Sequence, residues 1–461
     1  MSKPNIVFVF GDQHRAQATG YYGNDQVLTP NLDSLKEESV SFSNAVSGTP
    51  VCSPYRASLL TGQYPITHGV FVNDVCLDPE ALSVAKILKG AGYDTAYIGK
   101  WHLDGHGRKN FIPKERRQGF DFWRVLECTH DYNNSVYYGD KPQRKEWEGY
   151  DAKAQTRRAQ EYIRDRDGDK PFLLFLSWGP PHAPYGTAPE EFRKLYDPSE
   201  IELRPNVPES GIVKNPFAEK VTAAEVRKDI AGYYAHISAL DSYLGDLLST
   251  LEEEGISDET VFVYTSDHGD MLGSHGRYKK QVPWDESILV PFLLRYPRGL
   301  GNEPREVETP LNSPDIAPTL LGLSDIPVPE TMEGESFAPF LRGEENLERE
   351  AVLIECMHPF GQWPKTKEGK EYRGVRTRRY TYARSLEGPW ILYDNERDPY
   401  QVNNLCNQEE YVGLRERLDA LLKEKLERRE DQFLKGEDYI EQWGYPVDEN
   451  GTVPLGNTYE E

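Results

Sequence analysis

The sequence lacks the features that would place it in a membrane. No uninterrupted apolar run approaches the roughly 18 residues that a spanning helix needs, and the mean hydropathy is −0.69. The N-terminus also lacks a charged region, an apolar stretch and a small-residue cleavage site. A soluble globular protein located in the cytoplasm is therefore expected from the chain as given. A chain trimmed of its leader would look the same, and for that case a periplasmic or secreted location is expected.

Basic residues are in deficit. The chain has 53 Lys and Arg against 76 Asp and Glu, giving a formal net charge of −23. A field of this sign repels nucleic acid and anionic membranes, so neither is expected as a partner. It would also repel an anionic substrate. Any site for such a substrate must be locally basic within an acidic shell.

Cysteine is scarce and shows no metal-binding spacing. The five residues are Cys52, Cys76, Cys128, Cys356 and Cys406. They contain no CxxC pair, so a zinc ribbon or a thioredoxin motif is unsupported. Their number is odd, and a chain of 461 residues does not need disulfides for stability. Most of these residues are expected to be plain buried thiols.

Four short apolar runs predict buried parallel strands. They are Ile6–Phe10, Thr95–Ile98, Phe172–Leu176 and Val261–Tyr264. Each is followed by chemically useful residues, namely Asp12-Gln13-His14, Lys100-Trp101-His102, Pro181-His182 and Asp267-His268-Gly269-Asp270. In open α/β sheets, ligands bind beyond the carboxyl ends of the strands. The pattern predicts one functional site at that edge.

The rest of the chain predicts an α/β fold with two domains. Thr29-Pro30 is typical of a helix start, and apolar spacing from Tyr233 to Leu251 predicts a long helix. The charged stretch Glu344–Glu350 is interpreted as a linker. We therefore expect a large, mostly parallel sheet flanked by helices in residues 1–343. A smaller α+β subdomain is expected in residues 344–461, with strands within Tyr372–Arg384 and Trp390–Tyr393 and a helix around Leu414–Leu422.

The segment Cys52-Ser53-Pro54-Tyr55-Arg56 carries the sharpest signal. Ser53 is suited to cap a helix whose first turn holds Pro54, which places Cys52 just before a helix N-terminus. Free N–H groups and the helix dipole favour an anion there, and Arg56 can pair with the same anion through two donors. The alternative is an ordinary buried cysteine before a capped helix, but the Pro and Arg spacing favours a functional residue.

This segment resembles the signature of the type I sulfatase family, within the alkaline-phosphatase-like superfamily. The signature is C-x-P-x-R, a short helix and T-G, and Cys52–Gly62 matches it throughout. The resemblance implies that a formylglycine-generating enzyme oxidises Cys52 to formylglycine (3-oxoalanine), which hydrates to a diol. One hydroxyl would then attack sulfur and expel the alcohol. The other would lose its proton as sulfate leaves and the aldehyde returns.

Two strand ends offer metal ligands, Asp12 with Gln13 and Asp267 with His268. Carboxylate and amide oxygens suit Ca²⁺ or Mg²⁺. Solvated loop carboxylates are the alternative, which two such pairs at strand ends disfavour. The resemblance implies Ca²⁺, although Gln13 and His268 depart from an all-oxygen set and imidazole is a softer ligand. The metal would polarise the sulfate and lower the pKa of the attacking hydroxyl.

Four further residues match the family's motifs: Lys100, His102, His182 and Lys280. The resemblance implies that both lysines hold sulfate oxygens and that His182 or Lys280 protonates the leaving oxygen. The assignment of acid and base among His182, Lys280 and His102 stays open. A core histidine at position 102 and a solvated Lys279-Lys280 pair are the alternatives. We interpret His14, His106 and His130 as structural.

The segment from Asp104 to about Lys170 matches the family least, and loops of this kind usually set specificity. It offers basic residues (Lys109, Lys114, Arg116, Arg117) and aromatic ones (Trp123, Tyr132, Tyr137, Tyr138, Trp147). They would suit a sugar surface or ordinary packing equally well. The resemblance implies a sulfated carbohydrate as substrate. The alternatives are a phosphonate or phosphate ester hydrolase and a non-catalytic protein that binds sulfated glycans.

Overall fold

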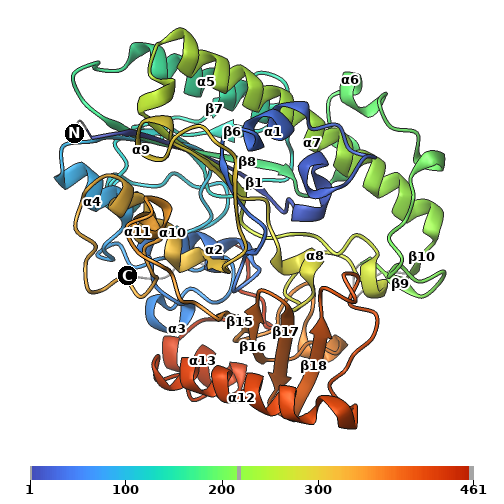
Figure 1. The fold of residues 1–461 in the computed structure, drawn as a ribbon. Helices are drawn as coiled ribbons and strands as arrows, with labels where there is room; N and C mark the ends of the chain where they lie inside the picture. Colours follow the sequence, from blue (N-terminus) through green and yellow to red (C-terminus); the bar gives the residue numbers. More distant parts are fainter. Residues whose placement is uncertain (1–2, 215–219, 456–461) are drawn as a thin grey trace.

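The computed structural model describes residues 3–214 and 220–455. Its centre is an eight-stranded sheet in the order β13-β2-β12-β11-β1-β8-β4-β5 (Figure 1). In that order the strands are Arg305–Val307, Val40–Phe42, Leu293–Arg295, Thr260–Ser266, Asn5–Asp12, Phe172–Pro181, Asp94–Lys100 and Phe122–Leu126. The four predicted strands are β1, β4, β8 and β11, and the expected fold class is confirmed.

These four strands are neighbours in the middle of the sheet and run in one direction. β1 pairs in parallel with β11 and with β8, and β8 pairs in parallel with β4. Only β12 is antiparallel to its neighbours, β11 and β2. The polar residues that follow β1, β4, β8 and β11 therefore meet at a single edge of the sheet, as expected.

Helices cover both faces of the central sheet (Figure 1). On one face lie α1, α5 and α7, which are Pro30–Lys36, Asp151–Asp165 and Ala223–Glu253. On the other lie α2, α4, α10 and α11, which are Cys52–Thr61, Val84–Gly90, Ser313–Leu323 and Ala338–Leu341. Along β1, Val7 and Val9 pack under the first group and Phe8 and Phe10 under the second. This alternation of faces is what a strand buried on both sides requires.

The long helix α7 begins earlier than its apolar spacing indicated. Its N-cap is Thr222, whose hydroxyl accepts from the Glu225 backbone N–H while the Glu225 carboxylate accepts from the Thr222 N–H. This reciprocal capping box stabilises the first turn, Ala223-Ala224-Glu225-Val226, and fixes the start of the helix. Thr29 is likewise the N-cap residue of α1, but its hydroxyl accepts from the Gly20 N–H and makes no cap bond to the helix.

The C-terminal region forms a four-stranded antiparallel sheet (Figure 1). Its strands are β15 Ala351–Cys356, β16 Tyr372–Thr377, β17 Tyr380–Ser385 and β18 Gly388–Asp394, followed by α12 Val412–Glu427 and α13 Gly436–Trp443. The pattern had not indicated β15, which directly follows the charged stretch. Arg376 ties this sheet to the central region, with Nη1 at 2.6 Å from Asp285 Oδ1 and Nη2 at 3.0 Å from Asn44 Oδ1. The division at residue 343 stays a prediction.

Shorter elements complete the described chain. They are α3 Pro65–His68, α6 Glu190–Arg193, α8 Asp285–Ile288, α9 Pro297–Leu300, β3 Ala45–Val46, β6 Val136–Tyr137, β7 Lys145–Glu146, β9 Ile212–Val213, β10 Lys220–Val221 and β14 Leu311–Asn312. All five cysteines are free thiols. Within the part of the chain that the structure describes, no helix has both the length and the apolar character to cross a membrane.

Candidate functional site

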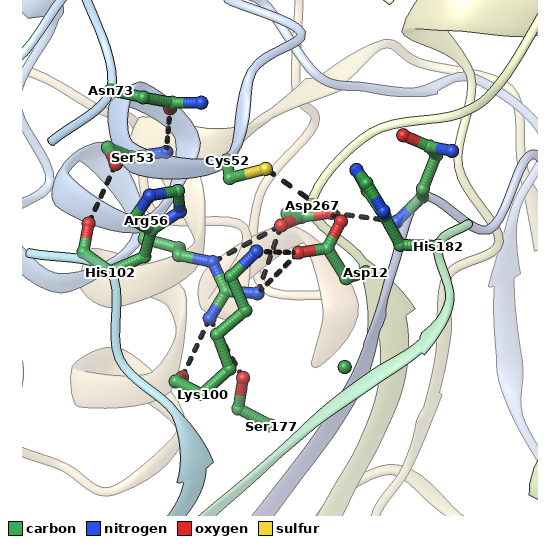
Figure 2. A network of polar contacts seen from close by, with 12 residues as sticks. Asp12, Cys52, Ser53, Arg56, Asn73, Lys100, His102, Ser177, His182 and Asp267 are labelled. Carbon is green, nitrogen blue, oxygen red and sulfur yellow. Dashed lines mark hydrogen bonds and ion pairs between the residues drawn. The ribbon is translucent and has the colours of Figure 1, made fainter. Parts of the chain in front are cut away.

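Cys52 is the first residue of α2 and is 2% exposed. The predicted cap at Ser53 is wrong, because the N-cap residue is Val51 and no side chain caps the helix. The Ser53 hydroxyl instead donates to the His102 carbonyl oxygen at 2.7 Å, and the Ser53 N–H donates to Asn73 Oδ1 at 3.1 Å (Figure 2). These bonds fix the first turn, so residue 52 still lies at the positive end of the helix.

Two strand ends and the loop that holds Lys280 surround the Cys52 sulfur. Its Sγ lies 3.2 Å from His268 Nε2, 3.6 Å from Lys280 Nζ and 3.7 Å from Asp12 Oδ1. Burial and the Asp12 carboxylate act to raise the pKa of Cys52, but Lys100, Lys280 and His268 together hold it well below its ordinary value. The surroundings therefore favour negative charge at this position.

A divalent cation fits the donor set beside Cys52. The ligand atoms of Asp12, Cys52, Asp267 and His268 lie within 4.8 Å of one another, and all four residues are buried. His268 Nδ1 lies 2.9 Å from the Gly269 carbonyl oxygen. A carbonyl only accepts, so we assign the proton to Nδ1. Nε2 then faces Asp12 Oδ1 at 3.6 Å and Asp267 Oδ1 at 3.5 Å, an arrangement typical of metal sites.

Gln13 also reaches this cluster. Its N–H donates to Asp267 Oδ1 at 3.0 Å, and its amide Nε2 donates to Asp270 Oδ2 at 2.5 Å. The amide oxygen thereby turns toward Lys280, whose Nζ donates to it at 2.9 Å. The residue is fully buried, and its oxygen links the carboxylate cluster to Lys280.

Arg56 and Lys100 compensate the buried carboxylates (Figure 2). The expectation that Arg56 pairs with an anion at residue 52 differs from the structure. Its Nε and Nη2 donate to Asp267 Oδ2 at 3.2 and 3.0 Å, and its Nη1 donates to the Lys100 carbonyl oxygen and to Ser177 Oγ at 2.9 and 2.8 Å. We therefore interpret Arg56 as a positioning residue. Lys100 makes a short ion pair with Asp12.

Lys280 and His182 form a directed pair. Lys280 Nζ lies 2.9 Å from His182 Nε2, and His182 Nδ1 lies 2.9 Å from the Ala183 carbonyl oxygen. The carbonyl assigns the proton to Nδ1, so Nε2 accepts from the lysine. Burial, then the Lys280 charge and His130, hold the pKa of His182 well below its ordinary value. His182 is therefore neutral and Lys280 is the donor.

His130, expected to be structural, lies against the site. Its ring stacks on that of His182, with centroids 4.4 Å apart and planes 7° apart. Burial, then the Lys100 charge, lower its pKa to about 3. A signal existed in the sequence, because His130 follows β5, a fifth strand that ends at the same edge of the sheet.

A carboxylate and an arginine position His102. His102 Nε2 lies 3.3 Å from Asp74 Oδ1. Arg108 holds the same carboxylate through Nε and Nη2, each at 2.7 Å. Although burial opposes it, the hydrogen bonds from Arg108 and His102 keep the pKa of Asp74 below its usual range. No sequence pattern indicated Asp74 or Arg108, because both residues, like His102, lie in loops.

The basic and aromatic residues of segment 104–170 divide between the core and the surface. Trp123 and Tyr132 are fully buried. Arg117 is 2% exposed, with Cζ at 5.2 Å from the centroid of Trp123, and Arg116 Nε donates to Asp104 Oδ1 at 2.6 Å. Ordinary packing therefore accounts for Trp123, Tyr132 and Arg117, whereas Lys109 is exposed and lines a cavity beside the site. For the exposed members the sugar-binding interpretation stays a prediction.

Two cavities border the site. One of about 580 Å³ is lined by Lys280 and extends to Arg277 and Trp363. Another of about 600 Å³ is lined by His130 and Arg108. A larger cavity, about 660 Å³, lies away from Cys52 and is lined by residues of both charge signs. The two cavities beside the His182–Lys280 pair are the ones that a substrate of the site can occupy.

Comparison with known proteins agrees with this geometry. The family model "Sulfatase" matches residues 4–326, and "N-sulphoglucosamine sulphohydrolase, C-terminal" matches residues 273–431. An ulvan-active sulfatase of Formosa agariphila is 44% identical over 454 residues, covering 97% of this chain and 86% of the relative. An endo-4-O-sulfatase of Bacteroides thetaiotaomicron is 30% identical over 482 residues, covering 91% and 92%.

A solved structure shares the whole architecture. It belongs to work on the metabolism of multiple glycosaminoglycans by Bacteroides thetaiotaomicron. Its TM-score is 0.82 at 28% identity, with 96% of this chain and 99% of that chain covered. Since a family model matches most of the chain and a 44% identical relative spans nearly all of it, this protein belongs to the sulfatase family.

Proposed function

We propose that this sulfatase removes sulfate from a sulfated carbohydrate, with an aldehyde at position 52 and a divalent cation. The observation that carries the proposal is the position of Cys52 Sγ, which contacts both the carboxylate and imidazole cluster and Lys280. The relatives' descriptions, ulvan-active sulfatase and endo-4-O-sulfatase, favour a polysaccharide-derived substrate.

Ca²⁺ is the cation that the donor set favours. Asp12, Asp267 and the amide oxygen of Gln13 are hard oxygen ligands, and His268 Nε2 completes the set. Mg²⁺ is the second choice, because it demands a stricter octahedral geometry. When bound, the cation would polarise the sulfate oxygens and lower the pKa of the hydroxyl at position 52.

The protein's own residues supply the proton transfers. Lys280 is the donor toward His182 and lies 3.6 Å from Cys52 Sγ, so we assign it as the acid for the leaving oxygen. His182 orients that ammonium through Nε2. A positioned acid of this kind contributes about 10²–10⁴-fold to rate.

His102 is suited to act as the base. Its Nδ1 is buried and has no hydrogen-bond partner among the described residues, while Asp74 holds its Nε2. Although burial opposes it, the neighbouring thiols and the Asp74 carboxylate raise the pKa of His102 to about 9. In its neutral form, Nδ1 would accept a proton from the hydrated aldehyde at position 52 as sulfate departs. Lys100, paired with Asp12 at the same edge, would contact a sulfate oxygen.

The maturing enzyme must act before the fold closes. Cys52 is 2% exposed, and Ser53, Pro54 and Arg56 are buried with it. A formylglycine-generating enzyme cannot bind a segment that is buried in the folded protein. We therefore expect conversion on the unfolded chain.

Sulfate release from a panel of sulfated saccharides, ulvan oligosaccharides included, tests the proposal. The protein is co-expressed with a formylglycine-generating enzyme, and Cys52→Ala is the control. Release that is lost in the control supports nucleophile and reaction together. If mass spectrometry shows the aldehyde and no saccharide releases sulfate, the proposal fails. Turnover of aryl phosphonates would then favour the phosphorus-ester alternative, and binding without turnover the glycan-binding one.

A further inference from the structure

The cavity beside Lys280 is built from distant parts of the chain. Tyr278 and Lys280 form one wall, and Trp363, Lys367 and Glu368 from the C-terminal region form another. Among the described residues, it is lined by the cations Lys214, Arg277, Lys280 and Lys367 and by a single carboxylate, Glu368. In a chain of net charge −23, this is the locally basic pocket that an anionic substrate requires.

Two tryptophans fix Arg277 within this cavity. Its Cζ lies 5.9 Å from the centroid of Trp284 and 6.0 Å from that of Trp363. Both rings are themselves supported, since Trp284 stacks on His275 at 4.8 Å and Trp363 on Trp390 at 6.0 Å. Arginine favours aromatic faces. The guanidinium is therefore held in place without using its hydrogen-bond donors.

Those donors are almost unused. A guanidinium has five N–H donors, yet the one hydrogen bond of the Arg277 side chain among the described residues goes from Nη2 to Glu368 Oε2 at 3.4 Å. The Glu368 side chain is 83% exposed, whereas that of Arg277 is 30% exposed. Arg56 shows the opposite case, because its donors all meet protein acceptors.

An arginine that is largely withdrawn from water with free donors is suited to receive an oxyanion. Partial burial lowers the pKa of Arg277, so its charge is less well solvated than that of a fully exposed arginine. An incoming oxyanion would form charge-assisted hydrogen bonds with donors that the protein leaves unused. The exposed Glu368, held only by a long contact, would be displaced by such a group.

We propose that Arg277 binds a second anionic group on the substrate, either a carboxylate or a further sulfate of the saccharide whose ester is cleaved. The inference rests on the proposed function and narrows it to saccharides with two anions. Arg277 is then a specificity-determining residue, and Glu368 competes with the substrate for it. The C-terminal region contributes through Trp363, which holds one face of the guanidinium.

Two matched substrate pairs test the inference with matured enzyme. One pair is a monosulfated disaccharide with a uronate carboxylate and its carboxyl-reduced counterpart. The other is disulfated and monosulfated glucosamine. The wild type is expected to prefer the doubly anionic member of at least one pair, and the pair that responds identifies the anion. Arg277→Gln should lower that preference in kcat/KM about 10-fold, mainly through KM.

Three further variants sharpen the kinetic result. Arg277→Lys should retain part of the preference, because the charge remains while the two-donor geometry is lost. Glu368→Gln should raise the preference by removing the competing carboxylate. Arg417→Gln is the matched control, since Arg417 makes a surface pair with Glu350 at 3.1 Å and should leave the preference at the wild-type value.

Binding separates this inference from the proposed function. Calorimetry with the Cys52→Ala protein gives the Kd of each saccharide without turnover. A tighter Kd for a doubly anionic member that Arg277→Gln weakens about 10-fold supports the inference, even if no saccharide is hydrolysed and the proposed function fails. Unchanged preferences in both pairs after Arg277→Gln, in binding and in kinetics, would overturn it.

Discussion

The cations of the site fall into two groups that differ in their partners. In the inner group, Arg56 and Lys100 make ion pairs with Asp267 and Asp12. In the outer group, Lys280 donates to neutral acceptors, Gln13 Oε1 and His182 Nε2. Both groups are buried. The inner charges are therefore compensated by the protein, whereas the charge of Lys280 has no carboxylate in hydrogen-bonding contact with it among the described residues.

This difference indicates a division of labour. A buried charge without a counter-ion costs stability unless something else compensates it. Lys280 borders a cavity, so an anionic substrate can supply the missing negative charge. Arg56 lines neither of the two cavities beside the site and acts on the carboxylates alone. Changes in the outer group should mainly alter rate, and changes in the inner group should mainly alter stability.

The largest expected effect comes from Lys280→Met. For saccharide sulfates, kcat should fall about 10²–10⁴-fold, because the alcohol leaves without a positioned acid. For 4-nitrophenyl sulfate the fall should be smaller, since the phenolate leaves readily without a proton. Steady-state kinetics on both substrates measures the contrast. Equal losses on both would show that Lys280 holds charge and is not the acid.

Arg56→Ala should act on folding. Removing the guanidinium leaves Asp267 and Asp12 less compensated in the interior, and breaking a buried pair in this way costs about 3–5 kcal/mol. The free energy of unfolding in urea measures the loss, with Lys280→Met as the comparison from the outer group. An unfolding free energy close to the wild-type value would mean that Lys100 and the bound cation compensate the carboxylates without Arg56.

The sequence predicts the shared edge of the sheet well for a physical reason. Parallel strands buried on both faces leave long apolar runs, and their carboxyl ends must converge. The residues that follow β1, β4, β8 and β11 can therefore be grouped from the sequence alone. Lys280 follows no strand directly, and it was identified by its match to a further motif of the family.

Contacts between loops were not predictable in the same way. Asp74 contacts His102, and Arg108 contacts Asp74, through loops that carry no periodic pattern. Aromatic residues such as Trp123 and Tyr132 look alike in a sequence whether they lie in the core or on a sugar-binding surface. The structure places both in the core, fully buried. The cap at Ser53 failed because its hydroxyl finds a distant acceptor, the His102 carbonyl. Long-range partners of this kind override local propensity.

Removal of the bound cation tests how far it compensates the carboxylates that Arg56 and Lys100 contact. Chelation with EDTA should abolish sulfate release and lower the stability, because Asp12 and Asp267 then face each other without it. If the cation is present at 100-fold its Kd before chelation, its removal lowers the free energy of unfolding by about 2.7 kcal/mol. Thermal unfolding and activity are followed while Ca²⁺ and then Mg²⁺ are added back. Full recovery with Mg²⁺ and none with Ca²⁺ would contradict the proposed cation.

The smallest expected effect concerns His130, which stacks on His182, the acceptor of the outer cation Lys280. Burial, then the Lys100 charge, lower its pKa in the folded protein to about 3, against about 6.5 in the unfolded chain. The unfolded chain therefore binds the proton first as the pH falls. The stability that neutral His130 contributes is present above pH 6.5 and is lost progressively toward pH 3, by at most about 1.4 kcal/mol per pH unit.

His130→Gln should remove this dependence while His182, whose pKa is also lowered, keeps its own. The variant should therefore lose less unfolding free energy than the wild type between pH 7 and pH 5, measured in urea at several pH values. The slope is the informative quantity, because the lost stacking on His182 lowers stability equally at every pH. Parallel slopes would mean that His130 accepts a proton in the folded protein, which would place it in contact with solvent through the cavity of about 600 Å³.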